Sequence, residues 1–279
     1  IEHVFLDVRD RTALHKVMRD VDVVFHAAAM KHVIVSERNP AEAIATNVGG
    51  TQNVIDACVA NDVERMILIS TDKAVNPTSV MGTTKLLAER LVSAMCNSKS
   101  KGNTKFGVVR FGNVLYSQGS VLEIWEKQMA RGEQITVTNA DMTRFFMSIP
   151  QSVQLIFTAV PLMNNGEIFI LKMSSCTIET LAEAYLEISG KQADDRNTIG
   201  VREGEKFHEE LLFAEETGSL LENDTFFVRM PLRFQNGNTT GLEEAGFVKS
   251  DRTSFTSDDA KYLLDREQVK GILNQYLQE

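Results

Sequence analysis

Residues 66–85 of the chain read MILISTDKAVNPTSVMGTTK. The apolar run at 66–70 predicts a buried β-strand, and the helical spacing of apolar residues from 80 to 97 predicts an α-helix. The polar loop between them contains Pro77, whose restricted φ suits a change of chain direction. A strand, a loop and a helix in this order form one unit of a sheet whose parallel strands are connected by helices.

The same alternation continues on both sides of this segment. Apolar runs separated by amphipathic helices are typical of a parallel sheet with helices on both faces, so we expect a doubly wound, Rossmann-like α/β fold. The expected strands are 4–6, 21–26, 66–70 and 106–111, and the expected helices are 12–19, 40–61 and 80–97.

The alternation becomes less regular after residue 115. We therefore assign residues 1–115 to a dinucleotide-binding domain and residues 116–279 mainly to a smaller substrate-binding lobe, with some segments returning to the first domain. Segment 236–257 is rich in Gly, Asn, Thr and Ser and is expected to be a loop. The other expected elements are helices at 121–131, 150–163, 178–189, 204–212 and 258–277 and strands at 135–137 and 167–171.

Composition narrows the functional class. The 279 residues carry a net charge of -9, which disfavours general attraction to nucleic acid or an anionic membrane, although a local basic pocket could still bind phosphate. The three cysteines (Cys58, Cys96 and Cys176) are far apart, which favours a reducing compartment. No apolar run reaches the roughly 18 residues of a membrane helix, and no signal-peptide pattern opens the chain. We expect a cytoplasmic protein and leave open a membrane segment upstream of Ile1.

A phosphate-binding glycine loop is missing from the sequence. Dinucleotide-binding sheets usually carry GxGxxG or GxxGxxG after their first strand, whereas the earliest glycine here is Gly49. Either the fold binds no dinucleotide, or its first strands and their glycine loop precede Ile1. Because Ile1 leads directly into a strand-like run, we favour the second alternative.

Ligands of a doubly wound sheet bind at the carboxyl ends of the strands. The residues that follow the expected strands are therefore of interest, and Thr71, Asp72 and Lys73 place a hydroxyl, a carboxyl and an amine at consecutive positions. Such a set can perform acid/base catalysis. A surface ion pair with a helix cap is the alternative interpretation.

Two further strand ends have both a functional and a purely structural interpretation. Asp7 could accept a hydrogen bond from an adenine amino group, or cap the next helix. The small residues Ala27 to Ala29 could allow a flat ligand to approach, or pack tightly in the sheet. Lys31 and His32 could contact phosphate or substrate, or lie in a solvated loop.

The segment STDKAVNPTSVMGTTK (70–85) resembles the active-site signature of the UDP-N-acetylglucosamine 4,6-dehydratases, in the polysaccharide-biosynthesis group of the extended short-chain dehydrogenase/reductases. The similarity runs from residue 1 to at least residue 213, and more weakly to the end. It is supported by four other segments: LDVRD (6–10), HAAAMKHV (26–33), RFGNVL (110–115) and VREGEKFHE (201–209).

The resemblance implies a set of binding residues. NAD or NADP is the implied cofactor, with Lys85 at the nicotinamide ribose and Asn47 as an asparagine that kinks the long helix. The other implied cofactor contacts are Asp7, Val8, Ala27, Ala28 and Ala29. The implied partner is a UDP-sugar, whose phosphate would suit the fork of an Arg guanidinium. Its implied contacts are Lys31, Asn113, Arg144, Arg202 and Glu205.

One position departs from the wider group. Most short-chain dehydrogenases have Tyr and Lys four residues apart, but here Met81 precedes Lys85. Since a thioether cannot exchange a proton, Met81 argues against a simple alcohol dehydrogenase and fits the subset of dehydratases that are similar in carrying Met there. Thr71, Asp72 or an ordered water must then help to remove the hydroxyl proton, and the sequence leaves these open.

The implied reaction begins with hydride transfer from C4 of the sugar to NAD(P)+, and the resulting ketone acidifies the C5 proton. Lys73, with its pKa lowered by burial, is the expected base, and Asp72 would donate a proton to the departing C6 hydroxyl before hydride returns to C6. Three alternatives remain: a 4-epimerase, a dehydratase that also inverts C5, and a non-catalytic nucleotide-binding module. Two long helices suit a dimer interface, so we expect a homo-oligomer.

Overall fold

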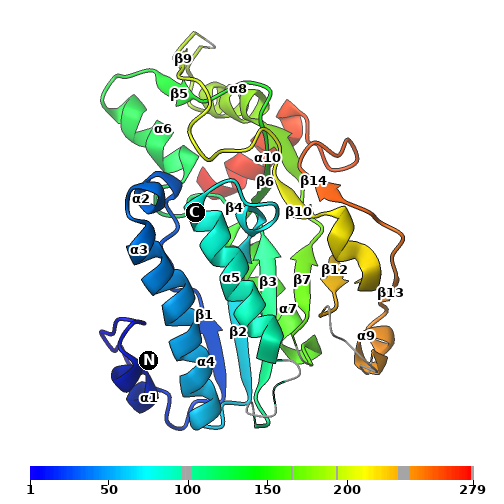
Figure 1. The fold of residues 1–279 in the computed structure, drawn as a ribbon. Coiled ribbons are helices and arrows are strands. Elements are labelled where there is room, and N and C mark those ends of the chain that lie inside the picture. Colours follow the sequence, from blue (N-terminus) through cyan, green and yellow to red (C-terminus); the bar gives the residue numbers. More distant parts are fainter. Residues whose placement is uncertain (96–97, 99–101, 165, 193, 232–238, 278–279) are drawn as a thin grey trace.

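The computed structural model of the protein describes residues 1–95, 98, 102–164, 166–192, 194–231 and 239–277, and its main feature is a seven-stranded sheet (Figure 1). The first four strands of this sheet pair in parallel, and the fifth is antiparallel to the fourth. The expected doubly wound α/β class is confirmed. In spatial order the strands are β1 (Val23–His26), β2 (Arg65–Thr71), β3 (Lys105–Phe111), β7 (Ile168–Leu171), β12 (Phe226–Arg229), β11 (Leu220–Glu222) and β13 (Val248–Lys249).

The central strand β2 shows why the sheet is parallel and covered. Met66, Ile67 and Leu68 are each at most 1% exposed, so both faces of the strand are buried. Helices α4 and α5 lie on one face of the sheet, and α7 lies on the other (Figure 1). The helices around the sheet are α1 (Arg11–Val17), α2 (Val33–Arg38), α3 (Pro40–Ala43), α4 (Gly50–Ala60), α5 (Val80–Ala94) and α7 (Ile149–Leu162).

A π-helix, η1 (Ile44–Gly49), joins α3 to α4 within the expected long helix. The amide of Asn47, inside this turn, accepts a hydrogen bond from Met30 N at 2.7 Å and donates one to Thr84 Oγ1 at 2.9 Å. The irregular turn thus allows Asn47 to connect the loop after β1 with α5. This loop borders the cavity described below.

A smaller lobe lies beyond the carboxyl ends of the parallel strands (Figure 1). It has a separate apolar core around Trp125, which is fully buried and donates through Nε1 to the Thr136 carbonyl at 2.8 Å. Its elements include α6 (Val121–Ala130), β4 (Asn113–Val114), β5 (Ile135–Val137), β6 (Thr143–Met147), β8 (Ser175–Thr177), α8 (Ile178–Ile188), β9 (Arg196–Thr198) and α10 (Arg266–Leu277). Strands β7, β11, β12 and β13 come after residue 115 yet belong to the main sheet. The domain division at residue 115 stays a prediction.

Three of the expected elements are wrong. Residues 4–6 form no strand, because no other strand among the described residues pairs with them. The expected helix at 204–212 is a turn followed by β10 (Glu210–Leu212), since Gly204 has a φ of +78° and Glu210 pairs with Thr256 instead of closing a helical turn. The expected helix at 258–277 begins only at Arg266, because the preceding segment pairs with β8 through the hydrogen bond from Leu264 N to the Ser175 carbonyl.

Several short elements were not expected. The segment predicted as loop at 236–257 lies outside the described residues up to 238 and then contains α9 (Thr240–Glu244), β13 and β14 (Phe255–Thr256). Helix α2 and strands β6, β8, β11 and β12 were also missed. Each of these strands has three to five residues. In so few residues, periodicity gives little signal.

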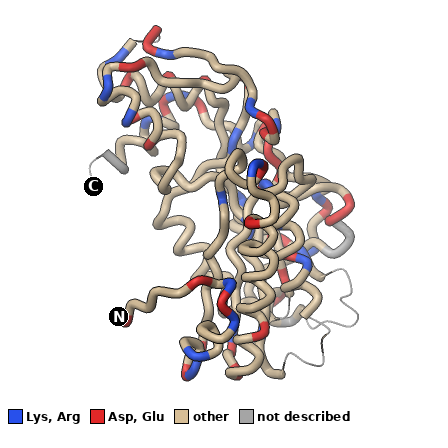
Figure 2. The backbone as a smooth tube through the Cα atoms, turned by 60° about the vertical axis from the view of Figure 1, so that its left-hand side comes forward, with Lys and Arg blue, Asp and Glu red and all other residues tan. Residues whose placement is uncertain are grey.

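Charged side chains are distributed over both lobes. Figure 2 shows Lys and Arg interspersed with Asp and Glu along most of the tube. In the part of the chain that the structure describes, no helix combines the length and apolarity needed to cross a bilayer. Cys58 and Cys176 are free and buried, and Cys96 lies outside the described residues.

Candidate active site

A cavity of about 630 Å³ lies at the carboxyl ends of the parallel strands, next to the smaller lobe. Its wall combines residues that are far apart in the sequence, because the loops after β1, β2 and β3 meet at this edge of the sheet. Most of the predicted site residues line it. They are Ala27, Ala29, Lys31, Thr71, Lys73, Met81, Lys85, Asn113, Arg144, Arg202 and Glu205.

The other predicted site residues lie off the cavity wall. Asp7 forms an ion pair with Arg9, and hydrogen bonds from Arg9 lower the pKa of Asp7 to about 2. Val8 contacts the long helix through a hydrogen bond from Asn53 Nδ2 to its carbonyl at 3.1 Å. Asp10, and not Asp7, caps α1. Of the remaining two cofactor candidates, Ala28 is exposed and Asn47 is buried.

The loop after β1 is not a packing surface. Ala27 and Ala28 are exposed and Ala29 is partly exposed, so the alternative of tight sheet packing is wrong for the first two. Lys31 lines the cavity and donates to the Gln118 carbonyl. This contact connects the loop after β1 with the loop before α6.

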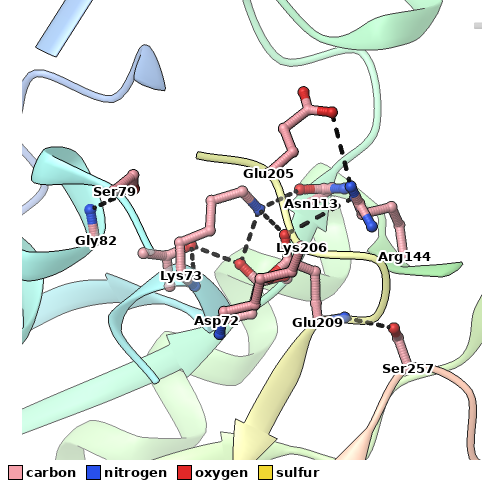
Figure 3. A network of polar contacts seen from close by, with 12 residues as sticks. Asp72, Lys73, Ser79, Gly82, Asn113, Arg144, Glu205, Lys206, Glu209 and Ser257 are labelled. Carbon is pink, nitrogen blue, oxygen red and sulfur yellow. Dashed lines mark hydrogen bonds and ion pairs between the residues drawn. The ribbon is translucent and has the colours of Figure 1, made fainter. Parts of the chain in front are cut away.

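Asp72 and Lys73 lie at the centre of the polar network in Figure 3. Asp72 Oδ1 accepts hydrogen bonds from Thr71 Oγ1 at 2.8 Å and from Lys73 Nζ at 3.0 Å. Asp72 is fully buried behind Lys73, so it reaches the cavity through its two neighbours, which both line it. A surface ion pair is therefore excluded as the explanation of this sequence.

The second oxygen of Asp72 is also informative. Oδ2 is buried and has no hydrogen-bond partner among the described residues. A Cβ added to Gly112 would lie 3.3 Å from this oxygen and 2.4 Å from Phe145 Cβ, so only glycine fits between the strand end and the carboxylate. Gly112 itself lines the cavity. The carboxylate therefore has one satisfied oxygen and one free oxygen close to the cavity wall.

Lys73 differs from its expected state. Burial alone would lower the pKa of its ammonium group, but attraction to Asp72 and Glu209 outweighs burial and raises the pKa above its ordinary value. Lys73 Nζ also donates to Asn113 Oδ1 at 3.2 Å. The expectation of a pKa lowered by burial is thus wrong, because the tertiary structure brings a second carboxylate to the amine.

Met81 and Lys85 lie one helical turn apart on α5. Met81 is 3% exposed. A Cβ on Gly82 would come within 2.2 Å of the Lys73 carbonyl oxygen, so glycine is needed where α5 approaches the loop after β2. Lys85 Nζ donates to the Ile69 carbonyl at 2.7 Å, and burial lowers the pKa of Lys85 to about 8. Lys85 is therefore a cation whose charge is lost just above neutral pH.

Buried His26 at the end of β1 leads to a prediction on acid stability. Burial, with repulsion from Lys85, lowers its pKa from 6.5 to about 4. Between pH 6.5 and about 4, His26 is protonated in the unfolded chain but neutral in the folded chain. The free energy of unfolding therefore decreases as the pH falls through this range. The loss from this group is about 3 kcal/mol at pH 4.

His26→Gln should remove this part of the pH dependence of the free energy of unfolding, because Gln does not titrate. Gln can still form the hydrogen bond to Thr51 Oγ1. Urea unfolding at several pH values between 4 and 7 measures the pH dependence, with exposed His3→Gln as the matched control. An identical pH dependence in wild type and His26→Gln would contradict the assignment.

Glu209 was missed by the sequence reasoning. Its Oε1 lies 3.3 Å from Lys73 Nζ and 3.8 Å from Arg144 Nε, and it lines the cavity (Figure 3). Glu209 ends the segment 201–209 that carries part of the resemblance, but nothing in that segment predicts a role for it. More than 130 residues of sequence separate it from Lys73, and no local pattern indicates that contact.

The segment 202–206 covers one side of the cavity. Arg202 lies 3.9 Å from Glu205, and Glu205 lies 4.0 Å from Arg144. Gly204 packs against Ser79, and its carbonyl accepts a hydrogen bond from Thr78 Oγ1 at 3.0 Å. Three of the five predicted substrate-binding residues, Arg144, Arg202 and Glu205, thus form a group of two cations and one anion.

A second ionic cluster is buried beneath the site. Arg110 on β3 donates to Glu89 Oε2 at 2.6 Å and to Glu216 Oε2 at 2.8 Å, and Arg229 lies 3.6 Å from Glu216. All four side chains are at most 4% exposed. Ser70, next to Thr71, donates to Glu89 Oε1 at 2.6 Å. The cluster is therefore connected to the carboxyl end of β2 through Ser70.

Comparison with known proteins supplies independent findings. The chain matches the family described as polysaccharide biosynthesis protein over residues 1–231. It is similar to an uncharacterized membrane protein of Methanocaldococcus jannaschii (46% identity, 96% of this chain, 79% of the relative). It is also similar to a UDP-N-acetylglucosamine 4,6-dehydratase (inverting) of Campylobacter jejuni (38%, 96%, 80%) and to a UDP-glucose 4-epimerase of Rickettsia rickettsii (39%, 96%, 78%). The solved structure of Pen from Bacillus thuringiensis superposes with a TM-score of 0.89 at 34% identity, covering 99% of this chain and 82% of that one.

Proposed function

Because the chain belongs to the family of polysaccharide biosynthesis proteins, we propose that it is a nucleotide-sugar 4,6-dehydratase, a lyase that converts UDP-N-acetylglucosamine to a UDP-linked 4-keto-6-deoxy sugar. The observation that carries this proposal is the contact between Lys73 Nζ and Asp72 Oδ1 at the cavity. Removal of water across C5 and C6 needs a base for the C5 proton and an acid for the C6 hydroxyl. An amine beside a carboxyl group can supply both.

The proton transfers balance within three residues. Thr71 Oγ1, on the cavity wall and hydrogen-bonded to Asp72, passes the proton of the C4 hydroxyl to Asp72. Asp72 returns this proton through Thr71 Oγ1 to the C6 hydroxyl, which leaves as water. Lys73 takes the C5 proton in its amine form, which its raised pKa makes the minor form at neutral pH, and returns one to C5 after the double bond is reduced. Two protons leave the sugar and two are added, so the three residues end in their starting states.

The wall at the end of β1 fits a nicotinamide nucleotide. Ala27 and Ala29 present no bulky side chain to the cavity, and Lys85 of α5 lines the same cavity. When bound, NAD or NADP would supply the removal of hydride from C4 and its return to C6. Lys85 would hold the nicotinamide ribose, and Asn47 would position the loop at Met30 that borders this wall. Asp7, Val8 and Ala28 remain proposed contacts of the rest of the cofactor.

The UDP moiety is proposed to bind on the opposite side of the cavity. Arg144 and Arg202 present guanidinium groups suited to phosphate oxygens. Glu205, 24% exposed between them, can accept hydrogen bonds from ribose hydroxyls. Lys31 and Asn113 would contact the sugar.

A 4-epimerase is the second candidate, because the Rickettsia rickettsii relative carries that name. Epimerisation at C4 requires hydride transfer and a base for the C4 hydroxyl, but no acid or base at C5 and C6. Asp72 could serve the C4 hydroxyl in that reaction as well, but Lys73 and its partner Glu209 have no task in it. The amine of Lys73 at the cavity therefore favours dehydration.

Assembly and location are also proposals. We place the protein in the cytoplasm, as a homo-oligomer that pairs through the long helices of the sheet. Ile44 and Leu87 support this arrangement, because both are large hydrophobic residues that are about half exposed on those helices.

Incubation of the protein with UDP-N-acetylglucosamine and NAD+ or NADP+, followed by proton NMR of the sugar nucleotide, tests the function. Dehydration should replace the signals of the C6 hydroxymethyl group with a methyl signal. A product that retains the C6 hydroxyl and differs at C4 would establish the epimerase instead. Stoichiometric cofactor binding with no new product would indicate a non-catalytic nucleotide-binding module.

A further inference from the structure

Glu209 is a buried carboxylate whose charge contacts only cations of the site among the described residues. It is 1% exposed, with Oε1 close to Lys73 and Arg144. Its Oε2 is buried and has no hydrogen-bond partner among the residues that the structure describes. Burying a carboxylate is costly unless opposite charges compensate it. The charge of the buried carboxylate is therefore stabilised by these two cations, and it stabilises their positive charges in turn.

The backbone of Glu209 is held independently of its side chain. Glu209 N donates to Ser257 Oγ at 2.8 Å, and Ser257 N donates to the Glu209 carbonyl at 2.8 Å (Figure 3). Ser257 Oγ is in turn 2.6 Å from Thr143 Oγ1 on β6. Anchoring of this segment thus needs no carboxylate at position 209. A role limited to holding the chain would leave the charge unexplained.

The charges around Lys73 come from three elements. Asp72 lies beside it in the loop after β2, Glu209 faces it from the segment before β10, and Arg144 faces both from β6. Asn113, a neutral residue, completes the contacts from β4. Arg144 also has Glu205 at 4.0 Å, whereas the carboxylates paired with Lys73 among the described residues are Asp72 and Glu209. Without the charge of Glu209, Lys73 keeps Asp72 alone as its ion-pair partner in this part of the structure.

We propose that Glu209 is a positioning residue that holds the Lys73 amine against the cavity and sets the balance between its ammonium and amine forms. This inference rests on the proposed function for its role in the reaction, and on geometry alone for its effect on Lys73. Neutralising Glu209 removes attraction for the ammonium form and leaves the repulsion from Arg144. The amine form of Lys73 should then persist to lower pH, but on a side chain that is less well held.

The direct test measures Lys73 without substrate. Lysines of the folded protein are reductively methylated with ¹³C-formaldehyde, and the Lys73 signal is assigned by its loss in Lys73→Arg. In Glu209→Gln the midpoint of its pH titration should move to lower pH than in wild type. Glu209→Asp, which keeps the charge, should restore the midpoint at least in part. Glu210→Gln is the matched control, because the neighbouring Glu210 contacts Asn76 and not Lys73, and should leave the midpoint unchanged.

Glu209→Met is a second uncharged variant in case Glu209→Gln does not fold, with thermal unfolding as the check. An unchanged Lys73 midpoint in a folded, uncharged variant would overturn the proposal. With substrate, Glu209→Gln should lower kcat far more than it changes KM, and the acid limb of the kcat profile should move to lower pH. A wild-type protein without dehydratase activity would refute the proposed function alone, because the NMR titration does not depend on turnover.

Discussion

Lys73→Ala is expected to lower the exchange of the C5 hydrogen of UDP-N-acetylglucosamine with deuterated solvent by about 10²- to 10⁴-fold, the usual contribution of a general base. The amine of Lys73 lines the cavity, and Asp72 and Asn113 hold it at 3.0 and 3.2 Å. Among the described residues that line the cavity, the other lysines are Lys31, which follows β1, and Lys85, which belongs to α5. Proton NMR of the sugar in deuterated buffer measures the exchange.

Asp72→Asn should reduce the same exchange, because C5 is acidified only when the preceding proton transfers at C4 proceed. Exposed Lys191→Ala is the matched control and should behave as the wild type. Circular dichroism should show that both variants of the site are folded. Unchanged exchange in Lys73→Ala and Asp72→Asn together would remove the proposed mechanism.

Arg110→Met is expected to destabilise the protein by about 3–5 kcal/mol, the range for breaking a buried ion pair by removing one partner. Arg110 is completely buried and binds both Glu89 and Glu216. Without it, two buried carboxylates share the single charge of Arg229, whose Nη2 has no hydrogen-bond partner in the described structure. Urea unfolding at neutral pH measures the loss.

Two variants separate lost charge balance from lost packing. Arg110→Met combined with Glu89→Gln leaves one cation with one carboxylate and should recover part of the stability. Arg11→Met is the surface control, since Arg11 is 64% exposed in its pair with Asp56 and such pairs contribute about 0–1 kcal/mol. A loss in Arg110→Met no larger than in Arg11→Met would show that the cluster is not a charge-balanced unit.

The first half of the fold was predictable because its signals are local. The strand and helix that enclose residues 71–79 have a continuous apolar run and a helical apolar stripe of sufficient length. The second half was less predictable, because its strands are short and pair with partners distant in sequence. Strand β10, for example, pairs with β14 across more than 40 residues.

The candidate site followed in part from the same logic. Lys73 and Asn113 follow neighbouring parallel strands, so the topology alone brings them to one edge, where they make a hydrogen bond. The contact of Lys73 with Glu209 does not follow from the order of the parallel strands. It depends on how the segment after residue 200 returns from the smaller lobe and is held by Ser257.

The amino-acid sequence by itself determined the parallel sheet, the edge of the sheet at which the cavity lies, and the adjacent amine and carboxyl group, because periodicity and adjacency act over a few residues. The tertiary structure alone decided the ionisation of Lys73 and the existence of the Arg110 cluster. Electrostatic energy depends on distance and on exclusion of water, and both are known only when segments separated by a hundred residues or more have packed together.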